Sequence, residues 1–71
     1  MTIQQQADAI VHDYTAEDEL RPHKSLYGIM TIFLTWRTGL DLDKARLEIE
    51  AAAERMEASR DKDWLTSPPV S

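Results

Sequence analysis

The densest group of chemically capable side chains is an acidic cluster in the segment HDYTAEDEL, residues 12–20. One imidazole and four carboxylates come from His12, Asp13, Glu17, Asp18 and Glu19. A histidine with several carboxylates is a ligand set that can hold a divalent metal. His12 and Asp13, however, are neighbours that point about 100° apart on a helix, so they do not converge on one ion. We therefore predict no metal site and interpret the cluster as a solvated acidic surface.

A catalytic base could come from His23, which lies at the start of an expected helix. No serine stands in a sequence context typical of a nucleophile. The two glycines, Gly28 and Gly39, are too far apart to form a phosphate-binding loop. We therefore expect neither enzymatic activity nor a bound cofactor.

Charge is distributed unevenly along the 71 residues. Residues 1–20 have five acidic and no basic side chains, residues 21–40 three basic and no acidic ones, and residues 41–71 eight acidic and five basic ones, so the local net charges are −5, +3 and −3. The overall charge of −5 disfavours nucleic-acid binding, which needs basic surface to displace counterions. It favours attraction to a protein partner with a basic surface. The expected contacts with that partner are Asp13, Glu17, Asp18 and Glu19.

The absence of cysteine excludes disulfides and fits a reducing cytoplasm. No segment combines a basic start, an apolar run and a small-residue cleavage site, so we expect a cytoplasmic rather than a secreted protein. The apolar stretch over residues 26–36 has 11 residues, whereas a membrane span needs about 20. We therefore expect no contact with a membrane.

Apolar residues recur every three or four positions in three segments, which predicts three helices and an all-α fold. The first helix is expected over residues 3–14, with Thr2 as its cap. The second is expected over residues 22–38 and should end at Gly39, the natural residue for a left-handed helix end.

The third helix is expected over residues 41–60, with Asp41 as its cap. We expect one domain over residues 1–65. Residues 66–71 contain two of the three prolines and no apolar periodicity, which predicts a disordered tail.

A connection of only about four residues between the second and third helices predicts a central antiparallel hairpin. The three-and-four spacing of apolar residues assigns a packing face to each helix. On the second helix this face consists of Leu26, Ile29, Phe33, Trp36 and Leu40, and on the third of Leu42, Ala45, Ile49, Ala52 and Met56.

The second helix carries more apolar surface than the hairpin needs. Its remaining surface is a narrow strip of small residues, Gly28, Thr31, Thr35 and Thr38. A helix that is apolar nearly all round is normally buried nearly all round, and a chain this short gains stability from oligomerisation. We therefore expect a homodimer, with an interface formed by Tyr27, Met30, Phe33, Leu34 and Trp36. The alternative is that the second helix is the central helix of a compact three-helix monomer.

Opposite its packing face, the third helix carries a thin apolar line formed by Leu47, Ala51 and Ala58. The alanines permit close approach of another helix and Leu47 can anchor it, so we interpret Leu47 and Ala51 as partner contacts. The alternative is that the alanines serve helix propensity and that the exposed leucine has no role.

These features predict a small acidic interaction protein that binds a larger protein and modulates or inhibits it. Inhibitors, anti-activators, antitoxins and adaptors have this profile, including those that phages and mobile elements encode. A first alternative is a helix-turn-helix transcriptional regulator, because a short glycine-containing turn joins the second and third helices. Its recognition helix would begin with Asp41 and Asp43, whose charge repels phosphates. A second alternative is a structural subunit of a larger complex.

Overall fold

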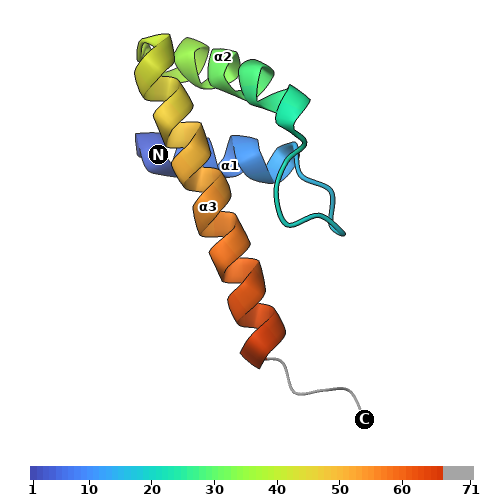
Figure 1. Ribbon diagram of the computed structural model, residues 1–71. Helices are drawn as coiled ribbons and strands as arrows, with labels where there is room; N and C mark the ends of the chain where they lie inside the picture. The colour runs from blue at the N-terminus through green and yellow to red at the C-terminus, as the bar shows by residue number, and fades with distance from the viewer. Residues whose placement is uncertain (67–71) are drawn as a thin grey trace.

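Three helices form the chain in the computed structural model, which describes the backbone of residues 1–66 and the side chains of residues 1–60. They are α1 (Ile3–Asp13), α2 (Tyr27–Thr38) and α3 (Leu42–Thr66), with a short 3₁₀ helix, η1 (Lys24–Leu26), directly before α2 (Figure 1). Residues 1–66 contain no strand. The all-α prediction is therefore confirmed.

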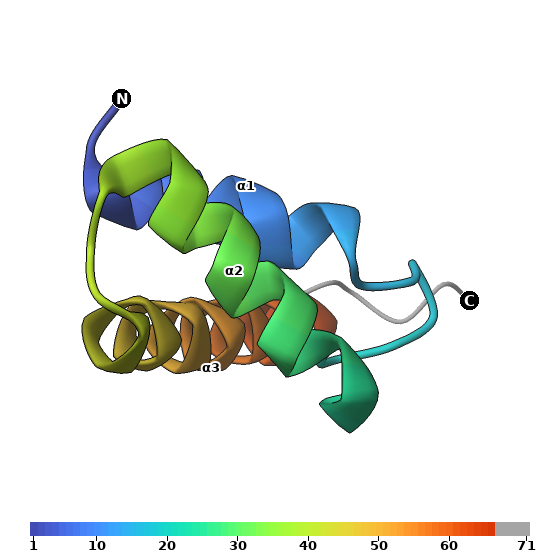
Figure 2. The same ribbon diagram turned by 90° about the horizontal axis from the view of Figure 1, so that it is seen from above.

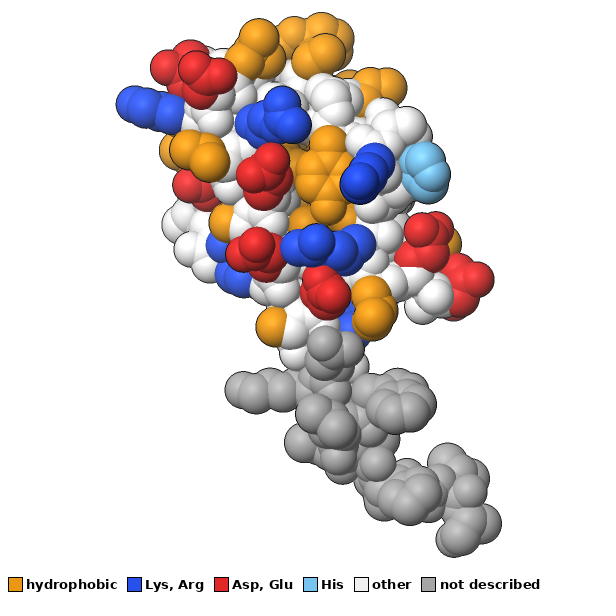
Figure 3. Space-filling view, in the orientation of Figure 1, with side chains coloured by type: hydrophobic (Ala, Val, Ile, Leu, Met, Phe, Trp, Pro, Cys, Tyr) orange, Lys and Arg blue, Asp and Glu red, His pale blue; other side chains and the backbone are white. Residues whose placement is uncertain are grey.

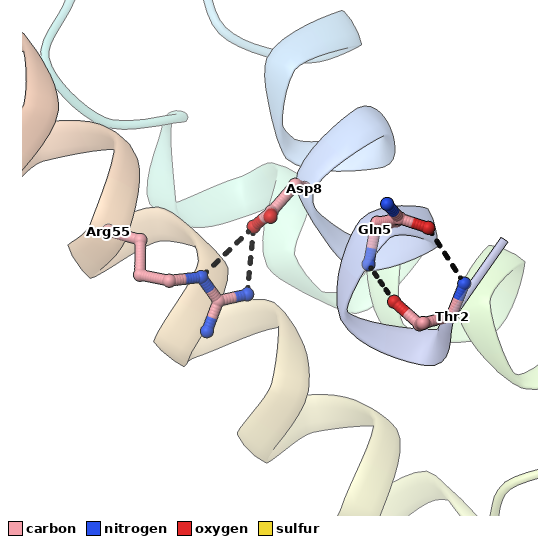
Figure 4. A network of polar contacts seen from close by, with 4 residues as sticks. All are labelled: Thr2, Gln5, Asp8 and Arg55. Carbon is pink, nitrogen blue, oxygen red and sulfur yellow. Dashed lines mark hydrogen bonds and ion pairs between the residues drawn. The ribbon is translucent and has the colours of Figure 1, made fainter.

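The helices begin and end where local groups satisfy the free backbone atoms. Thr2 and Gln5 form a capping box at α1: the Thr2 hydroxyl accepts from the Gln5 N–H at 3.1 Å, and Gln5 Oε1 accepts from the Thr2 N–H at 2.9 Å (Figure 4). Gly39 ends α2 with a φ of 77°, in the left-handed region. Asp41 Oδ1 accepts from the Lys44 N–H at 3.2 Å and caps α3.

Two helix bounds differ from the predicted ones by more than one residue. α2 begins at residue 27 rather than 22, because His23 caps the separate turn η1. α3 continues to Thr66 rather than ending at residue 60, because no glycine or proline interrupts it before Pro68. Apart from Thr66, the predicted tail lies outside the described residues.

α2 and α3 meet at the turn that joins them and then diverge steeply in Figure 1, and α2 lies obliquely over α3 in Figure 2, so the two helices do not run side by side. The short connection over residues 39–41 determines where the two helices meet, but it leaves the crossing angle open. The predicted antiparallel hairpin is therefore not confirmed. α1 packs against both helices, and its Asp8 accepts hydrogen bonds from Arg55 of α3, at 3.2 Å from Nε and 2.8 Å from Nη2 (Figure 4).

The core lies between the three helices. Its buried apolar residues are Ala7, Ile10 and Val11 of α1, Met30 and Leu34 of α2, and Ala45, Ile49, Ala52 and Ala53 of α3. Three residues of the packing face predicted for the third helix are thus buried, Met56 packs against the core, and Leu42 is exposed.

The packing face predicted for the second helix is only partly right, because Leu26, Phe33 and Leu40 pack against the core but the other two residues do not. Met30 and Leu34, which were expected to contact a second molecule, have no exposed surface. Ile29 and Trp36, which were expected to pack inside the chain, are 48% and 74% exposed. The core of a single chain therefore includes Met30 and Leu34, two residues that were predicted to lie at a dimer interface.

Threonine hydroxyls explain this difference. The Thr31 hydroxyl donates to the Tyr27 carbonyl and the Thr38 hydroxyl to the Leu34 carbonyl, both at 2.7 Å. A hydroxyl satisfied by its own helix does not need water, so Thr31 and Thr38 can face the other helices. Thr31 is accordingly buried next to Met30. The Thr35 hydroxyl oxygen is also buried but has no hydrogen-bond partner among the described residues.

The connector between α1 and η1, residues 14–23, is held against α3. Arg21 Nε lies 2.6 Å from Glu57 Oε2. Arg60 donates to the carbonyl of Ala16 at 3.2 Å and also to that of Glu19. These contacts position the acidic part of the connector beside the middle of α3.

Candidate functional site

The acidic cluster does not assemble into a metal site in the described part of the chain, where no three His, Asp or Glu side chains converge. His12 and Asp13 are exposed at the end of α1, and Glu17, Asp18 and Glu19 are exposed in the connector. None of these four carboxylates forms an ion pair with another described residue. Their charge is therefore presented to solvent.

His23 and Ser25 come together although the sequence analysis did not pair them. Ser25 Oγ lies 2.8 Å from His23 Nδ1, and the Ser25 N–H donates to the same nitrogen at 3.2 Å. This is the geometry of a helix cap, in which the ring satisfies the first free N–H of η1. Both residues are exposed. A polar side chain at the position directly before a helix start is the sequence signal for this contact.

The residues expected at a dimer interface have three different environments. Met30 and Leu34 belong to the core. Tyr27 and Phe33 are half-buried and pack against it. Trp36 alone is largely exposed, so it is the member of the set most accessible to another molecule. The dimer itself stays a prediction.

A continuous apolar surface on α2 was missed because Ile29 and Trp36 were assigned to the packing face of the hairpin. It consists of Ile29, Ile32 and Trp36, all exposed, and we call it the outer face of α2. At about 100° per residue, these three positions lie within an arc of about 60°. Phe33 borders the face and contacts Trp36 edge to face, with ring centroids 5.7 Å apart. Hydrophobic side chains accordingly gather along the edge of the molecule formed by α2 (Figure 3).

An open depression of about 440 Å³ lies where α1 and α3 begin, and we call it the end depression. Its apolar lining consists of Ile3, Leu40 and Leu47, and its polar lining of Thr2, Gln4, Lys44 and Glu48. Leu47, which the sequence analysis proposed as a partner contact, is 64% exposed there, whereas Ala51 is half-buried. The depression combines two segments that are far apart in the chain, residues 2–4 and 40–48, so sequence spacing could not reveal it.

Among the described residues, no helix has both the length and the apolar character needed to cross a bilayer.

Comparison of the chain with protein-family models, with curated proteins and with solved structures finds no match. A function is therefore inferred from the outer face of α2, the end depression and the acidic connector.

Proposed function

We propose that this chain is a small helical interaction protein that binds a larger protein and modulates or inhibits it, and that it is not an enzyme. The observation that carries the proposal is the outer face of α2. The core of the chain is closed by Met30 and Leu34 on another side of the same helix, so folding does not require Ile29, Ile32 and Trp36 to be apolar. Contiguous exposed apolar surface typically marks an interaction site, and tryptophan is enriched among the residues that dominate binding energy.

The acidic connector supports a target with a basic surface. The carboxylates of Asp13, Glu17, Asp18 and Glu19 are exposed, and none has an ion-pair partner within the described residues. Such a field raises the rate of encounter with a basic partner, and salt weakens it. Association with the target should therefore slow as the salt concentration rises.

A homodimer in the cytoplasm completes the proposal. The cysteine-free composition supports a reducing compartment. Trp36 supports self-association, because it remains largely exposed after the single chain has folded.

A DNA-binding regulator has less support. Asp41 and Asp43 are exposed at the start of α3, where a recognition helix would meet phosphates. Arg46, in the next turn, is already paired with Glu50 at 3.3 Å. Retardation of duplex DNA by the purified chain at low salt would overturn this preference.

The test is affinity capture from a lysate of the source cell, with captured proteins identified by mass spectrometry. We expect the wild-type chain to retain a partner that the Ile29→Glu variant loses. Leu42→Glu is the control, because Leu42 is also exposed, at 58%, but lies at the start of α3, outside both the outer face of α2 and the acidic connector. Equal capture by wild type and Ile29→Glu would contradict a role for the outer face of α2, and the absence of any specific partner would contradict the function.

A further inference from the structure

We propose that the outer face of α2 packs against the outer face of α2 in a second copy, with the two helices antiparallel and a two-fold axis between Ile32 and Phe33. The inference rests on the proposed function, because it concerns the same surface. It adds that a second copy covers this surface until a target protein displaces it.

Nothing in the described part of the chain covers the outer face of α2. The face lies on the side of the helix opposite Leu34, which is fully buried in the core. In Figure 2, α2 lies over the other two helices, so its outer side points away from them. A second helix can therefore lie along Ile29, Ile32 and Trp36 without meeting α1 or α3.

The lack of charge on this surface favours an occupant that is uncharged as well. Residues 25–36 contain no Asp, Glu, Lys or Arg. The first charged side chains on either side are Lys24 and Arg37, which are both exposed and form no ion pair with another described residue. A charged occupant would lose hydration against this face without gaining an ion pair. The same face of a second copy is equally uncharged.

Charges at the ends of the face determine the orientation of the pair. In a parallel pair, Arg37 would lie beside Arg37 of the second copy and repel it. In the antiparallel pair the two arginines are about 13.5 Å apart along the helix axis, which exceeds the Debye length of about 8 Å at physiological salt. The same register brings Lys24 opposite Asp41 of the second copy. Asp41 is exposed and forms no ion pair within the described residues.

Side-chain size also fits the antiparallel register. Ile29 lies opposite Trp36 of the second copy, so each indole packs on an isoleucine rather than on the other indole. These two positions are 48% and 74% exposed in the single chain. Ile32, which is 42% exposed, lies beside the axis and meets its own copy. A two-fold interface uses the same patch on both subunits, and the outer face of α2 meets that condition.

The size of the contact makes the dimer weak enough for a target to replace. Stable complexes bury about 800 Å² and roughly 20–30 residues on each partner, whereas the outer face of α2 consists of Ile29, Ile32 and Trp36 with Phe33 at its border. A target that contacts both this face and the acidic connector buries more surface than the second copy does. Dimerisation and target binding are therefore mutually exclusive.

The test is disulfide trapping of full chains that each carry one introduced cysteine, because the sequence has no cysteine of its own. With helix axes about 8–10 Å apart and Cα atoms about 2.3 Å from each axis, opposite Cα atoms are roughly 4–5 Å apart, which a disulfide can span. Oxidised Ile32→Cys should therefore form a covalent dimer in non-reducing denaturing electrophoresis.

A mixture of variants tests the register. Ile29→Cys and Trp36→Cys should each remain uncrosslinked alone, because each residue lies about 10 Å along the axis from its own copy. An equimolar mixture of the two should form a mixed covalent dimer. Leu20→Cys measures cross-linking by random collision, because Leu20 is as exposed as Ile29 but lies in the connector.

Sedimentation equilibrium measures the affinity without a cross-link. Trp36→Ser and Ile32→Glu should each weaken dimerisation at least about thirtyfold, the effect of losing a dominant contact residue. Leu47→Glu, at a 64% exposed position of α3, is the control and should dimerise like the wild type. Circular dichroism of each variant verifies that the loss of the dimer is not a loss of folding.

Three results would overturn the proposal. The first is a wild-type chain that stays monomeric up to about 1 mM. The second is cross-linking of Ile29→Cys alone and Trp36→Cys alone as efficient as that of their mixture, which would indicate a parallel pair. The third is equal cross-linking of Leu20→Cys and Ile32→Cys, which would indicate random collision.

Lysate capture separates this inference from the proposed function. The reduced Ile32→Cys chain should retain the target and the oxidised dimer should lose it, whereas retention by both would contradict the shared surface. Specific cross-linking without any target would remove only the proposed function. A target captured through Ile29 by a chain that never cross-links would remove only this inference.

Discussion

Leu34 and Trp36 are two positions apart on α2, yet one is fully buried and the other is 74% exposed. Two residues span about 200° of a helix, so the pair points to opposite sides. Both stripes of α2 are apolar and both repeat every three or four residues, so periodicity alone could not choose between them. The choice follows from which side meets the side chains of α1 and α3.

Truncation of Leu34 tests this assignment. Leu34→Ala should lower the free energy of unfolding by about 2–5 kcal/mol, because it opens a cavity in the core. That is a large part of the roughly 4–11 kcal/mol expected for a chain of this length. Ile32→Ala, at a 42% exposed position, should cost less than about 1 kcal/mol. Urea denaturation measures both, and a larger loss in Trp36→Ala than in Leu34→Ala would place the core on the other side of α2.

Two glycines of helix α2 have different roles, one at its end and one inside it. Gly39 ends the helix at a φ of 77°, which a residue with a side chain rarely adopts. Gly28 lies inside the helix with normal dihedral angles, and an added Cβ would contact nothing within 4 Å. The left-handed backbone conformation therefore requires a glycine at position 39, whereas Gly28 only lowers the stability of the helix.

A matched pair of substitutions separates the two roles. Gly39→Ala should destabilise the protein by about 1–2 kcal/mol through the left-handed conformation alone, since space is free around it. Gly28→Ala should stabilise it by about 0.5–1 kcal/mol. Thermal melting followed by circular dichroism measures both shifts. A destabilised Gly28→Ala chain would show that another molecule packs closely against the start of α2.

The whole molecule closes its core without a second copy. All three helices contribute buried residues, and the connector is fastened to α3 by Arg21 and Arg60. Apolar surface remains exposed at the outer face of α2 and at the end depression, and also at Met1, Leu20 and Leu42. In the proposed homodimer, association would therefore add stability to a fold that already exists in the single chain.

The dependence of the melting temperature on protein concentration tests whether a single chain folds without a partner. The wild-type melting temperature should rise with protein concentration, because the dimer binds only folded chains. The Trp36→Ser variant should melt cooperatively at a temperature independent of concentration. An unfolded Trp36→Ser chain would show that the core needs its partner, and an aggregated or partly unfolded wild-type chain would favour the structural-subunit alternative.

The sequence by itself determined the all-α class, the caps at Thr2 and Asp41, and the helix end at Gly39. It also identified most of the core face of α3. These features follow from local chemistry. A capping side chain accepts a hydrogen bond from a backbone N–H at most three residues away, and a helix with one apolar side buries that side. The tertiary structure decided the orientation of α2, the crossing of α2 over α3 and the existence of the end depression. Each of these depends on contacts between segments far apart in the chain, and an α2 that is apolar on two sides carries no local preference for either.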